Sequence, residues 1–345
     1  MDLSHRRRFG RSDIELEPLG FGGNALGNLY ASVDEFAAEA TVREAYGSGV
    51  RYFDTAPLYG HGLSEHRIGR VLRRVSRDSF VLSSKVGRIL RPHGKTPPPR
   101  LDPSQGGIFA DELPFSPVFD YSYDGVLRSF EDSLQRLGLN RIDILLIHDA
   151  DEWTHKGEYA ARLEQVEKET VPALERLKSE GAIRSYGAGV NQAEACLDLM
   201  RRGDFDGFLL AGRYTLLEQG ALAGLLPRAV ERGVSIILGA PFNSGILVTG
   251  ARPEATYNYL PAPESVLCRV AEIERVCAEF AVPLPAAALQ FPMGHPAVVT
   301  NIPGARSPEE VRVHRQWMSL AIPGEFWQTL RGRGLIHSEA PVPMA

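Results

Sequence analysis

Residues 50–60 read Val-Arg-Tyr-Phe-Asp-Thr-Ala-Pro-Leu-Tyr-Gly. The first five form a short apolar run that ends on the carboxylate of Asp54, and Tyr59 follows in a loop marked by proline and glycine. Buried parallel strands read as near-continuous apolar runs, and a polar residue at a strand's carboxyl end faces the mouth of the barrel or sheet. The stretch therefore predicts a buried strand that delivers an acid and a phenol to one site.

Two further apolar runs end in the same way, one on Lys85 and the other on His148. A lone lysine or histidine at a strand end is usually an ion-pair partner or a structural residue. Together with Asp54 and Tyr59, however, they form a set of acid, phenol, amine and imidazole. Such a set indicates proton-transfer chemistry.

Apolar runs of this kind recur eight times and alternate with segments of helical periodicity. This alternation favours parallel strands joined by right-handed crossovers. Eight repeats fit a single (β/α)8 TIM barrel, which needs about 250 residues before insertions, better than an open sheet. The runs lie near residues 19–22, 50–54, 80–85, 142–148, 182–190, 206–211, 234–240 and 298–302, and the helical segments include residues 33–46, 124–137, 163–177 and 263–280.

The segments around these repeats carry their own predictions. Residues 7–16 alternate around a Gly/Ser/Asp turn and predict a β-hairpin that plugs the barrel's N-terminal end. Residues 87–123 contain seven prolines and no helical pattern, so we expect a long structureless loop, a lid or a disordered segment, on the same face as the site. A second polar loop is expected over residues 149–161. We expect one barrel domain over residues 1–334 and a flexible tail over 335–345.

The bulk composition is that of an ordinary soluble protein. The 345 residues are 43% hydrophobic and 23% charged, with a formal net charge of −5. Without a long Lys/Arg stripe, this balance argues against a nucleic-acid partner. Three cysteines without metal-type spacing fit a reduced compartment, and no signal peptide or membrane-length apolar stretch is found. We therefore expect a cytoplasmic protein with no metal site, whose state as monomer or homo-oligomer is not readable from the sequence.

The motifs resemble those of the aldo-keto reductase family over almost the whole chain. Several matching motifs in the right order are far more specific than a single one. The resemblance rests on residues 54–60 with Ser64 and Glu65, on Lys85, on residues 145–148, and on residues 302–307 with Glu310. Other segments are similar to a branch of sugar 1-dehydrogenases that act on L-fucose, D-arabinose and L-galactose, and to pyridoxal 4-dehydrogenase: residues 20–30, 119–122, 211–217 and 241–245.

The resemblance implies an NAD(P)-dependent oxidoreductase that oxidises the anomeric carbon of an aldose to a lactone, with a small sugar or aldehyde as its substrate. Two other enzyme activities stay open, namely pyridoxal oxidation and the reduction of an aldehyde or ketone. A non-catalytic cofactor-binding regulator on the same barrel is the alternative from another functional class.

Tyr59 is the expected general acid/base for hydride transfer. The ordinary pKa of a phenol, about 10, is too high for a base near neutral pH. We therefore expect the ammonium of Lys85 to favour the phenolate and so to lower this pKa. Asp54 would hold Lys85 in place, and the resemblance implies that His148 orients the substrate oxygen or helps to relay the proton.

No Gly-x-Gly-x-x-Gly signature follows a strand in the way a Rossmann fold requires, and the resemblance instead implies a nicotinamide cofactor in the barrel mouth. Asn191, one residue beyond the family's usual place at Val190, would meet the carboxamide. Two common family features are missing: Gly239 stands where an aromatic residue usually stacks on the nicotinamide, and Ala211 stands where a glutamine usually contacts it. The expected cofactor residues are Gly23, Asp54, Asn191, Phe242, Asn243, Ser244, Gly245, Leu247, Gly304, Arg306 and Glu310.

Gly304 and Glu310 occupy positions at which many relatives place cations around a 2′-phosphate. A carboxylate there would repel phosphate and could accept a hydrogen bond from a ribose hydroxyl. This favours NAD, whereas Arg306 could still meet a phosphate, so NADP remains possible. The alternative for Glu310 is a solvated position on a helix face.

The substrate pocket is expected to be polar. Asn24, Gly87 and Asp149 stand where reductases of apolar substrates often carry bulky or aromatic residues. The amide of Asn24 and the carboxylate of Asp149 suit the adjacent hydroxyls of a sugar. Trp153 could stack on the C–H face of a sugar or pack under the long loop, and Asp149 could instead cap its loop. The expected substrate residues are Asn24, Tyr59, His148, Asp149 and Trp153.

Overall fold

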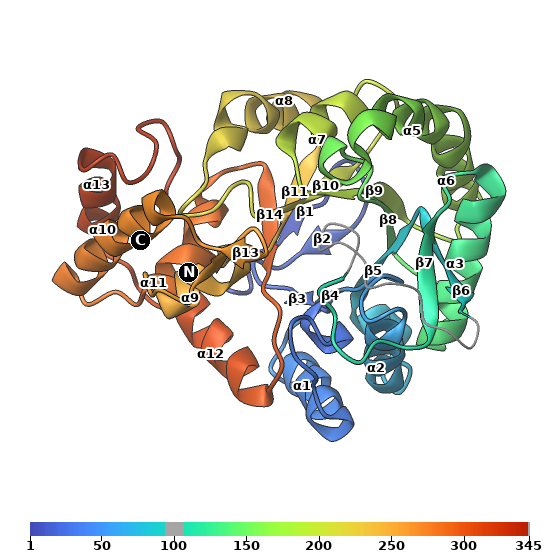
Figure 1. The fold of residues 1–345 in the computed structure, drawn as a ribbon, viewed down its shortest axis with the longest axis horizontal. Coiled ribbons are helices and arrows are strands. Elements are labelled where there is room, and N and C mark those ends of the chain that lie inside the picture. The colour runs from blue at the N-terminus through green and yellow to red at the C-terminus, as the bar shows by residue number, and fades with distance from the viewer. Residues whose placement is uncertain (94–106, 344–345) are drawn as a thin grey trace.

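Eight parallel strands form a nearly closed barrel in the computed structural model, which describes residues 1–93 and 107–343 (Figure 1). The Gly20 N–H donates to the Asn301 carbonyl at 2.9 Å and the Gly22 N–H donates to the Pro303 carbonyl at 3.0 Å, so the last strand meets the first. The strands, in order around the barrel, are β3 (Phe21–Gly22), β4 (Tyr52–Asp54), β5 (Val81–Val86), β8 (Ile144–His148), β9 (Ser185–Val190), β10 (Gly207–Ala211), β11 (Ser235–Gly239) and β14 (Val298–Ile302). All eight predicted strands and the barrel are confirmed.

Helices follow the strands and surround the barrel (Figure 1). α3 shows how the sequence sets their limits: the Ser122 side chain accepts from the Gly125 N–H at its start, and Gly138, in the left-handed region, ends it. The connecting helices are α1 (Glu35–Gly47), α2 (Leu63–Leu72), α3 (Tyr123–Leu137), α6 (Val171–Ser179), α7 (Ala193–Leu199), α8 (Leu225–Arg232), α11 (Leu284–Gln290) and α12 (Pro308–Ser319).

A hairpin plugs the N-terminal end of the barrel, as predicted. It consists of β1 (Arg7–Arg8) paired antiparallel with β2 (Glu15–Leu16). Its apolar side chains are completely or almost completely buried and join a cluster formed by the inward-facing residues of the barrel strands. The cluster contains Phe9, Ile14, Leu16, Tyr52, Ile144, Leu146, Leu209, Ile237, Val299 and Ile302.

The long segment after β5 corrects the expectation of a structureless loop. β6 (Arg88–Pro92) pairs antiparallel with β7 (Phe115–Phe119) over five residue pairs, and residues 94–106 of this segment lie outside the described residues. Both strands contain a proline, which lacks an N–H. A two-stranded ribbon has two outer edges, where a missing donor is tolerated, so the prolines do not exclude pairing.

Two further expectations are corrected. The predicted polar loop over residues 149–161 contains α4 (Glu152–His155) and the start of α5 (Tyr159–Gln165), which continues through a π-helical turn into α6. The segment after residue 334 was expected to carry no core residue, yet it buries Leu335, Ile336 and Ala340. These apolar residues are too few and too widely spaced to form a recognisable period. Residues 344–345 lie outside the described part.

The segment between β11 and β14 is the longest excursion from the barrel. It contains α9 (Ile246–Thr249), α10 (Glu264–Glu279) and a hairpin of β12 (Thr256–Tyr257) with β13 (Leu260–Pro261). Asn258 and Tyr259 form the turn of this hairpin with φ angles of 49° and 67°. Two positive φ angles are the requirement of a type I′ turn, which here presents Tyr259 at the mouth of the barrel.

The last helix is α13 (Gly324–Gly332). Within the described residues, no single helix is both long and apolar enough to cross a membrane; α10 and residues Leu284–Gly294 pass such a test only as a pair bent by 101°.

Candidate active site

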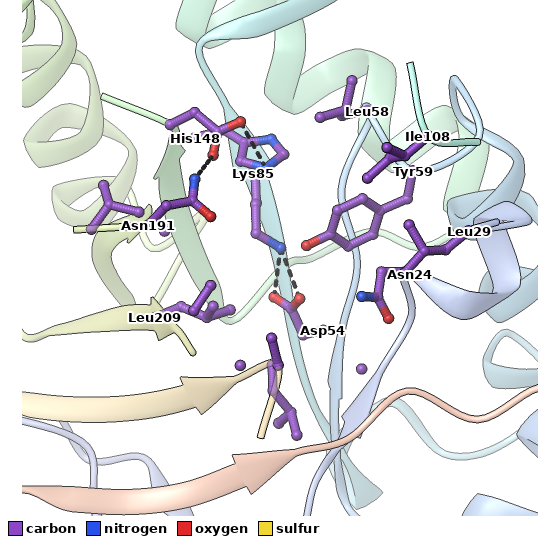
Figure 2. A pocket seen from close by; sticks show the side chains of 18 of the residues that line it. Asn24, Leu29, Asp54, Leu58, Tyr59, Lys85, Ile108, His148, Asn191 and Leu209 are labelled. Atoms are coloured by element: carbon purple, nitrogen blue, oxygen red, sulfur yellow. Dashed lines mark hydrogen bonds and ion pairs between the residues drawn. The ribbon is translucent and has the colours of Figure 1, made fainter. Parts of the chain in front are cut away.

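The centre of the barrel mouth is an ion pair between Asp54, at the end of β4, and Lys85, near the end of β5 (Figure 2). Lys85 Nζ donates to Asp54 Oδ2 at 2.7 Å, to Oδ1 at 3.0 Å and to the Thr55 carbonyl at 2.9 Å. Ser83 Oγ adds a bond to Asp54 Oδ1 at 2.7 Å. Burial raises the pKa of Asp54, and Lys85 and Ser83 oppose that rise. The ammonium is thereby locked to one position.

Tyr59 lies beside this pair and is partly exposed to the pocket. Lys85 Nζ is 4.6 Å from the centre of its ring. Burial, followed by the negative charges of Asp54 and Asp149, raises the pKa of Tyr59 well above its ordinary value, and Arg88 lowers it. The expected lowering by Lys85 is therefore corrected. Its physical reasons are burial, which is the largest cause, and the carboxylate of Asp54, which lies 2.7 Å from the ammonium and compensates its charge.

His148, the last residue of β8, faces Tyr59 across the pocket (Figure 2). The two rings are 5.9 Å apart and almost perpendicular, at 85°. Burial, followed by the positive charges of Lys85 and Arg88, holds the pKa of His148 well below its ordinary value, so the imidazole is neutral. The Tyr121 hydroxyl donates to the His148 carbonyl at 2.6 Å and anchors the strand end.

Asp149 is not a free acceptor for substrate. Arg88 Nη2 donates to its Oδ2 at 2.6 Å, and Asn191 Nδ2 donates to its Oδ1 at 3.2 Å. Sequence reasoning missed Arg88. The sequence signal that could have identified it is its position three residues after Lys85, directly after Gly87. Gly87 has a φ of 94° and turns the chain out of the barrel. Asn191 also binds the buried Asp151.

The pocket above Tyr59 is more apolar than expected. Asn24 and Trp153 line it, as predicted, but so do several large apolar side chains. Phe109 was missed: its ring lies 6.0 Å from that of Tyr59, and it comes from the segment that follows the residues outside the described part. The apolar and aromatic wall consists of Leu29, Leu58, Ile108, Phe109, Trp153, Leu209 and Tyr259. Gly239 and Ala211 also line the pocket, and a Cβ at Gly239 would lie 2.8 Å from the Leu209 side chain.

A second cavity, which we call the groove, continues from the pocket between the β11 side of the mouth and α12. The predicted residues Phe242, Asn243, Ser244, Gly245, Gly304, Arg306 and Glu310 line it. Pocket and groove adjoin, since both are lined by Asn24, Leu29, Ala240, Tyr259 and Ile302.

The groove fits the anionic part of an elongated ligand. Arg306 lines it, and the Nε of this guanidinium is buried without a hydrogen-bond partner among the described residues. Gly245 has a φ of 100°, and a Cβ there would meet open space, which leaves room for a ligand against the backbone. The residues present therefore fit a dinucleotide, whose phosphates the groove residues would hold next to the pocket.

Two predicted cofactor residues, Gly23 and Leu247, line neither cavity, and Asn243 lines the groove but also makes structural contacts. Gly23 is fully buried against the Asp54 carbonyl, 2.6 Å from the position of a Cβ. The Asn243 side chain accepts from Thr215 Oγ1 at 2.6 Å and donates to the Gly212 carbonyl. Leu247 is completely buried in the core. Sequence similarity could not separate Gly23 and Leu247 from the residues that face the groove.

Glu310 is exposed and lies at the start of α12. Its Oε2 accepts from the Arg306 N–H at 2.8 Å, while Ser307 Oγ accepts from the Glu310 N–H at 3.2 Å. This is close to a capping box. Sequence reasoning missed two neighbours on α12: the rings of His314 and Trp317 are 5.5 Å and 6.2 Å from that of Phe242, and both line the groove.

The barrel and its mouth, in which a tyrosine and a histidine face one another across a pocket with an adjoining groove, are those of an oxidoreductase of the barrel type. Residues 18–332 match the aldo/keto reductase family, and the chain belongs to this family.

Curated relatives cover nearly the whole chain. The chain is 41% identical to the pyridoxal 4-dehydrogenase of Microbacterium luteolum over 341 residues, which is 97% of this chain and 99% of the relative. It is 35% identical to the D-threo-aldose 1-dehydrogenase of a Pseudomonas species over 324 residues, 94% of this chain and 95% of the relative. The sugar and pyridoxal dehydrogenase branch expected from the sequence is thereby confirmed.

Solved structures share the fold. An aldo-keto reductase of Bacillus halodurans in its holo form superposes with a TM-score of 0.73 at 24% identity, covering 98% of this chain and 97% of that one. The glycerol dehydrogenase of Gluconobacter oxydans gives 0.74 at 19% identity, covering 100% and 98%.

Proposed function

We propose that this enzyme oxidises a cyclic hemiacetal to a lactone with a nicotinamide dinucleotide, and that Tyr59, Asp54, Lys85 and His148 form its catalytic centre. The observation that carries the proposal is the position of Tyr59 and His148, which face one another in the pocket that adjoins the groove. A substrate oxygen between these two side chains would lie within reach of both.

The chemistry then follows from the chain's own groups. In the oxidation, Tyr59 as phenolate takes the proton of the hemiacetal hydroxyl, the C–O bond becomes a carbonyl, and the carbon's hydride leaves. The bound nicotinamide supplies the acceptor for that hydride. His148, neutral in this structure, donates a hydrogen bond that orients the oxygen. Because the pKa of Tyr59 is raised, we expect oxidation to be favoured at alkaline pH and reduction at lower pH.

The pocket favours a flat substrate with few hydroxyls. Asp149 and Asn191 are already bonded to one another, and Phe109, Trp153 and Tyr259 supply aromatic walls. Such a pocket suits the internal hemiacetal of pyridoxal, and the relative with 41% identity is a pyridoxal 4-dehydrogenase. Pyridoxal is therefore the first substrate to test.

An aldose is the second candidate and was the leading expectation from the sequence. It would be oxidised at the anomeric carbon by the same transfer. Asn24 lines the pocket as a polar group for its hydroxyls, and a D-threo-aldose 1-dehydrogenase is among the relatives. The members of this class to test are L-fucose, D-arabinose and L-galactose.

NAD is the proposed cofactor. The carboxylate of Glu310 lies at the groove beside Arg306, where it would repel a 2′-phosphate. Arg306 donates to the Leu29 carbonyl at 2.7 Å through Nη2, so part of its donor capacity is already used. We propose that NADP is used less well.

One experiment separates these possibilities. Purified protein is incubated with NAD or NADP and, in parallel, pyridoxal, L-fucose, D-arabinose, L-galactose and a simple aldehyde, and the absorbance of the reduced cofactor is followed in both directions. Turnover of pyridoxal with NAD supports the proposal, and turnover of aldoses alone makes the second candidate correct. If the protein binds NAD but converts no compound, it is a cofactor-binding regulator or acts on another substrate class, and the proposal fails.

A further inference from the structure

The ion pair between Arg88 and Asp149 lies beside His148, and the chemistry above does not use it. Arg88 is the first residue of β6, and its guanidinium lies 4.1 Å from the centre of the Phe119 ring on β7. Its Nη2 is 2.6 Å from Asp149 Oδ2, with the two side chains only 2% and 11% exposed. Breaking a buried pair leaves an uncompensated charge, so the contact fixes the orientation of this carboxylate.

The same carboxylate has a second basic neighbour. Asp149 Oδ2 is 3.5 Å from His148 Nε2, while Oδ1 accepts from Asn191 at 3.2 Å. The guanidinium of an arginine is a permanent cation in proteins, whereas an imidazole becomes a cation only if it takes up a proton. Asp149 Oδ2 therefore makes its shorter contact with Arg88 and lies too far from His148 Nε2 for a close ion pair.

We propose that Arg88 is a positioning residue that holds the Asp149 carboxylate on the β6–β7 ribbon and toward Asn191, so that it does not form an ion pair with His148. The inference rests on the proposed function, in which an uncharged imidazole orients the substrate oxygen. Neither the family match nor the motifs of the sequence point to Arg88.

Charged and titratable groups on several elements surround His148 and influence its pKa. Lys85 and Arg88 are the positive charges that act with burial to keep its pKa low. Removal of Arg88 takes away one of them and also frees Asp149 to pair with Nε2, and both changes raise the pKa of His148. The surrounding titratable groups are Asp54 on β4, Tyr59 after β4, Lys85 on β5, Arg88 on β6, Tyr121 before α3, Asp149 after β8 and His155 on α4.

The direct test is a titration that needs no substrate. Protein with ¹³Cε1-labelled histidine is titrated by NMR, and the His148 signal is identified by its loss in His148→Gln. In Arg88→Met we expect the His148 midpoint to rise by about 1–3 pH units, as for a group that gains an opposite charge nearby. Arg88→Met/Asp149→Asn should return it toward the wild-type value. The matched control is Arg91→Met, an exposed arginine on the same strand.

A second readout is the pH profile of kcat/KM. In Arg88→Met the acid limb should move upward together with the His148 midpoint, and Arg88→Lys should restore most of the wild-type profile. If Arg88→Met does not fold, Arg88→Lys is compared with Arg88→Lys/Asp149→Asn. We expect a smaller rise of the His148 midpoint in Arg88→Lys and no rise in the double variant.

The outcomes are distinguishable. If Arg88→Met lowers Tm and turnover at every pH while the His148 midpoint stays where it is in wild type, Arg88 merely stabilises the ribbon and the inference is wrong. If the midpoint moves and the double variant restores it, but no tested substrate is converted, the positioning role stands and the proposed function fails.

Discussion

Lys85 Nζ lies 2.7 Å from Asp54 Oδ2, and both side chains are almost completely excluded from solvent, at 1% and 2% exposure. Three contacts to Asp54 and the Thr55 carbonyl hold the ammonium. The pair therefore supplies a fixed local dipole rather than a net positive charge beside Tyr59.

Lys85→Met should be harmful in two ways. It leaves the buried Asp54 carboxylate uncompensated, which costs about 3–5 kcal/mol of stability, and it shifts the rise of oxidation with pH further to the alkaline side. Denaturant unfolding and the pH profile of kcat/KM measure these effects. Lys85→Met/Asp54→Asn should regain part of the stability. A pH profile of unchanged shape would show that Lys85 does not tune Tyr59.

Tyr59→Phe should lower turnover by about 10²–10⁴-fold, because it removes only the oxygen that transfers the proton. Binding of NAD, followed by quenching of protein fluorescence, should be nearly unchanged. Tyr46→Phe is the matched control, since it removes a hydroxyl that contacts Ser79, away from the mouth, and should keep full turnover. Retention of wild-type turnover by Tyr59→Phe would exclude it as the acid/base.

Glu310→Arg should improve the use of NADP relative to NAD by about 1–3 kcal/mol, in line with charge-assisted hydrogen bonds. The substitution also removes the contact from Oε2 to the Arg306 N–H. Glu310→Gln is therefore the control, because it keeps an acceptor there without the charge. The measurement is kcat/KM for both cofactors. If the ratio of kcat/KM for NADP to that for NAD is unchanged in Glu310→Arg, Glu310 only stabilises the first turn of α12.

His314 should make the protein sensitive to mild acid. Burial lowers its pKa from the ordinary value of about 6.5 to about 4. Between these two pH values the unfolded chain is protonated at His314, whereas the folded protein is not. This contribution to stability is complete above about pH 6.5 and is lost as the pH falls toward 4.

At pH 5 that loss amounts to about 2 kcal/mol for the one group. Unfolding of the cofactor-free protein at pH 7 and pH 5 checks it: His314→Phe should lose less stability on acidification than wild type, and replacement of the exposed His5 should change nothing. Equal losses in wild type and His314→Phe would contradict the prediction.

The strand ends were predictable from the sequence because they combine two strong signals. A buried parallel strand must be apolar throughout, so a polar terminal residue such as Asp54 or His148 is conspicuous. The remainder depends on contacts between distant segments. Arg88 becomes part of the site only because β6 pairs with β7, which places the guanidinium of Arg88 over the ring of Phe119. Tyr259 reaches the mouth only through the turn between β12 and β13.

Charge effects were the other source of error. The sequence places a cation close to Tyr59, and distance alone would lower the pKa of the phenol. The structure adds burial and the carboxylates Asp54 and Asp149, which outweigh it. Desolvation depends on the complete packing around a group, and no local pattern in the sequence reports it.

The hairpin plug also fixes where a proton can travel. Phe9, Ile14 and Leu16 close the N-terminal end with completely or almost completely buried side chains, so an ion cannot reach bulk water by that path. Tyr59 lines the pocket, and bound substrate and cofactor would cover it there. We therefore expect the proton to appear in solution together with product departure, after the redox step. Stopped-flow absorbance with a pH indicator measures both proton release and formation of the reduced cofactor. If the two occurred at the same rate, the proton would have a separate path to solvent.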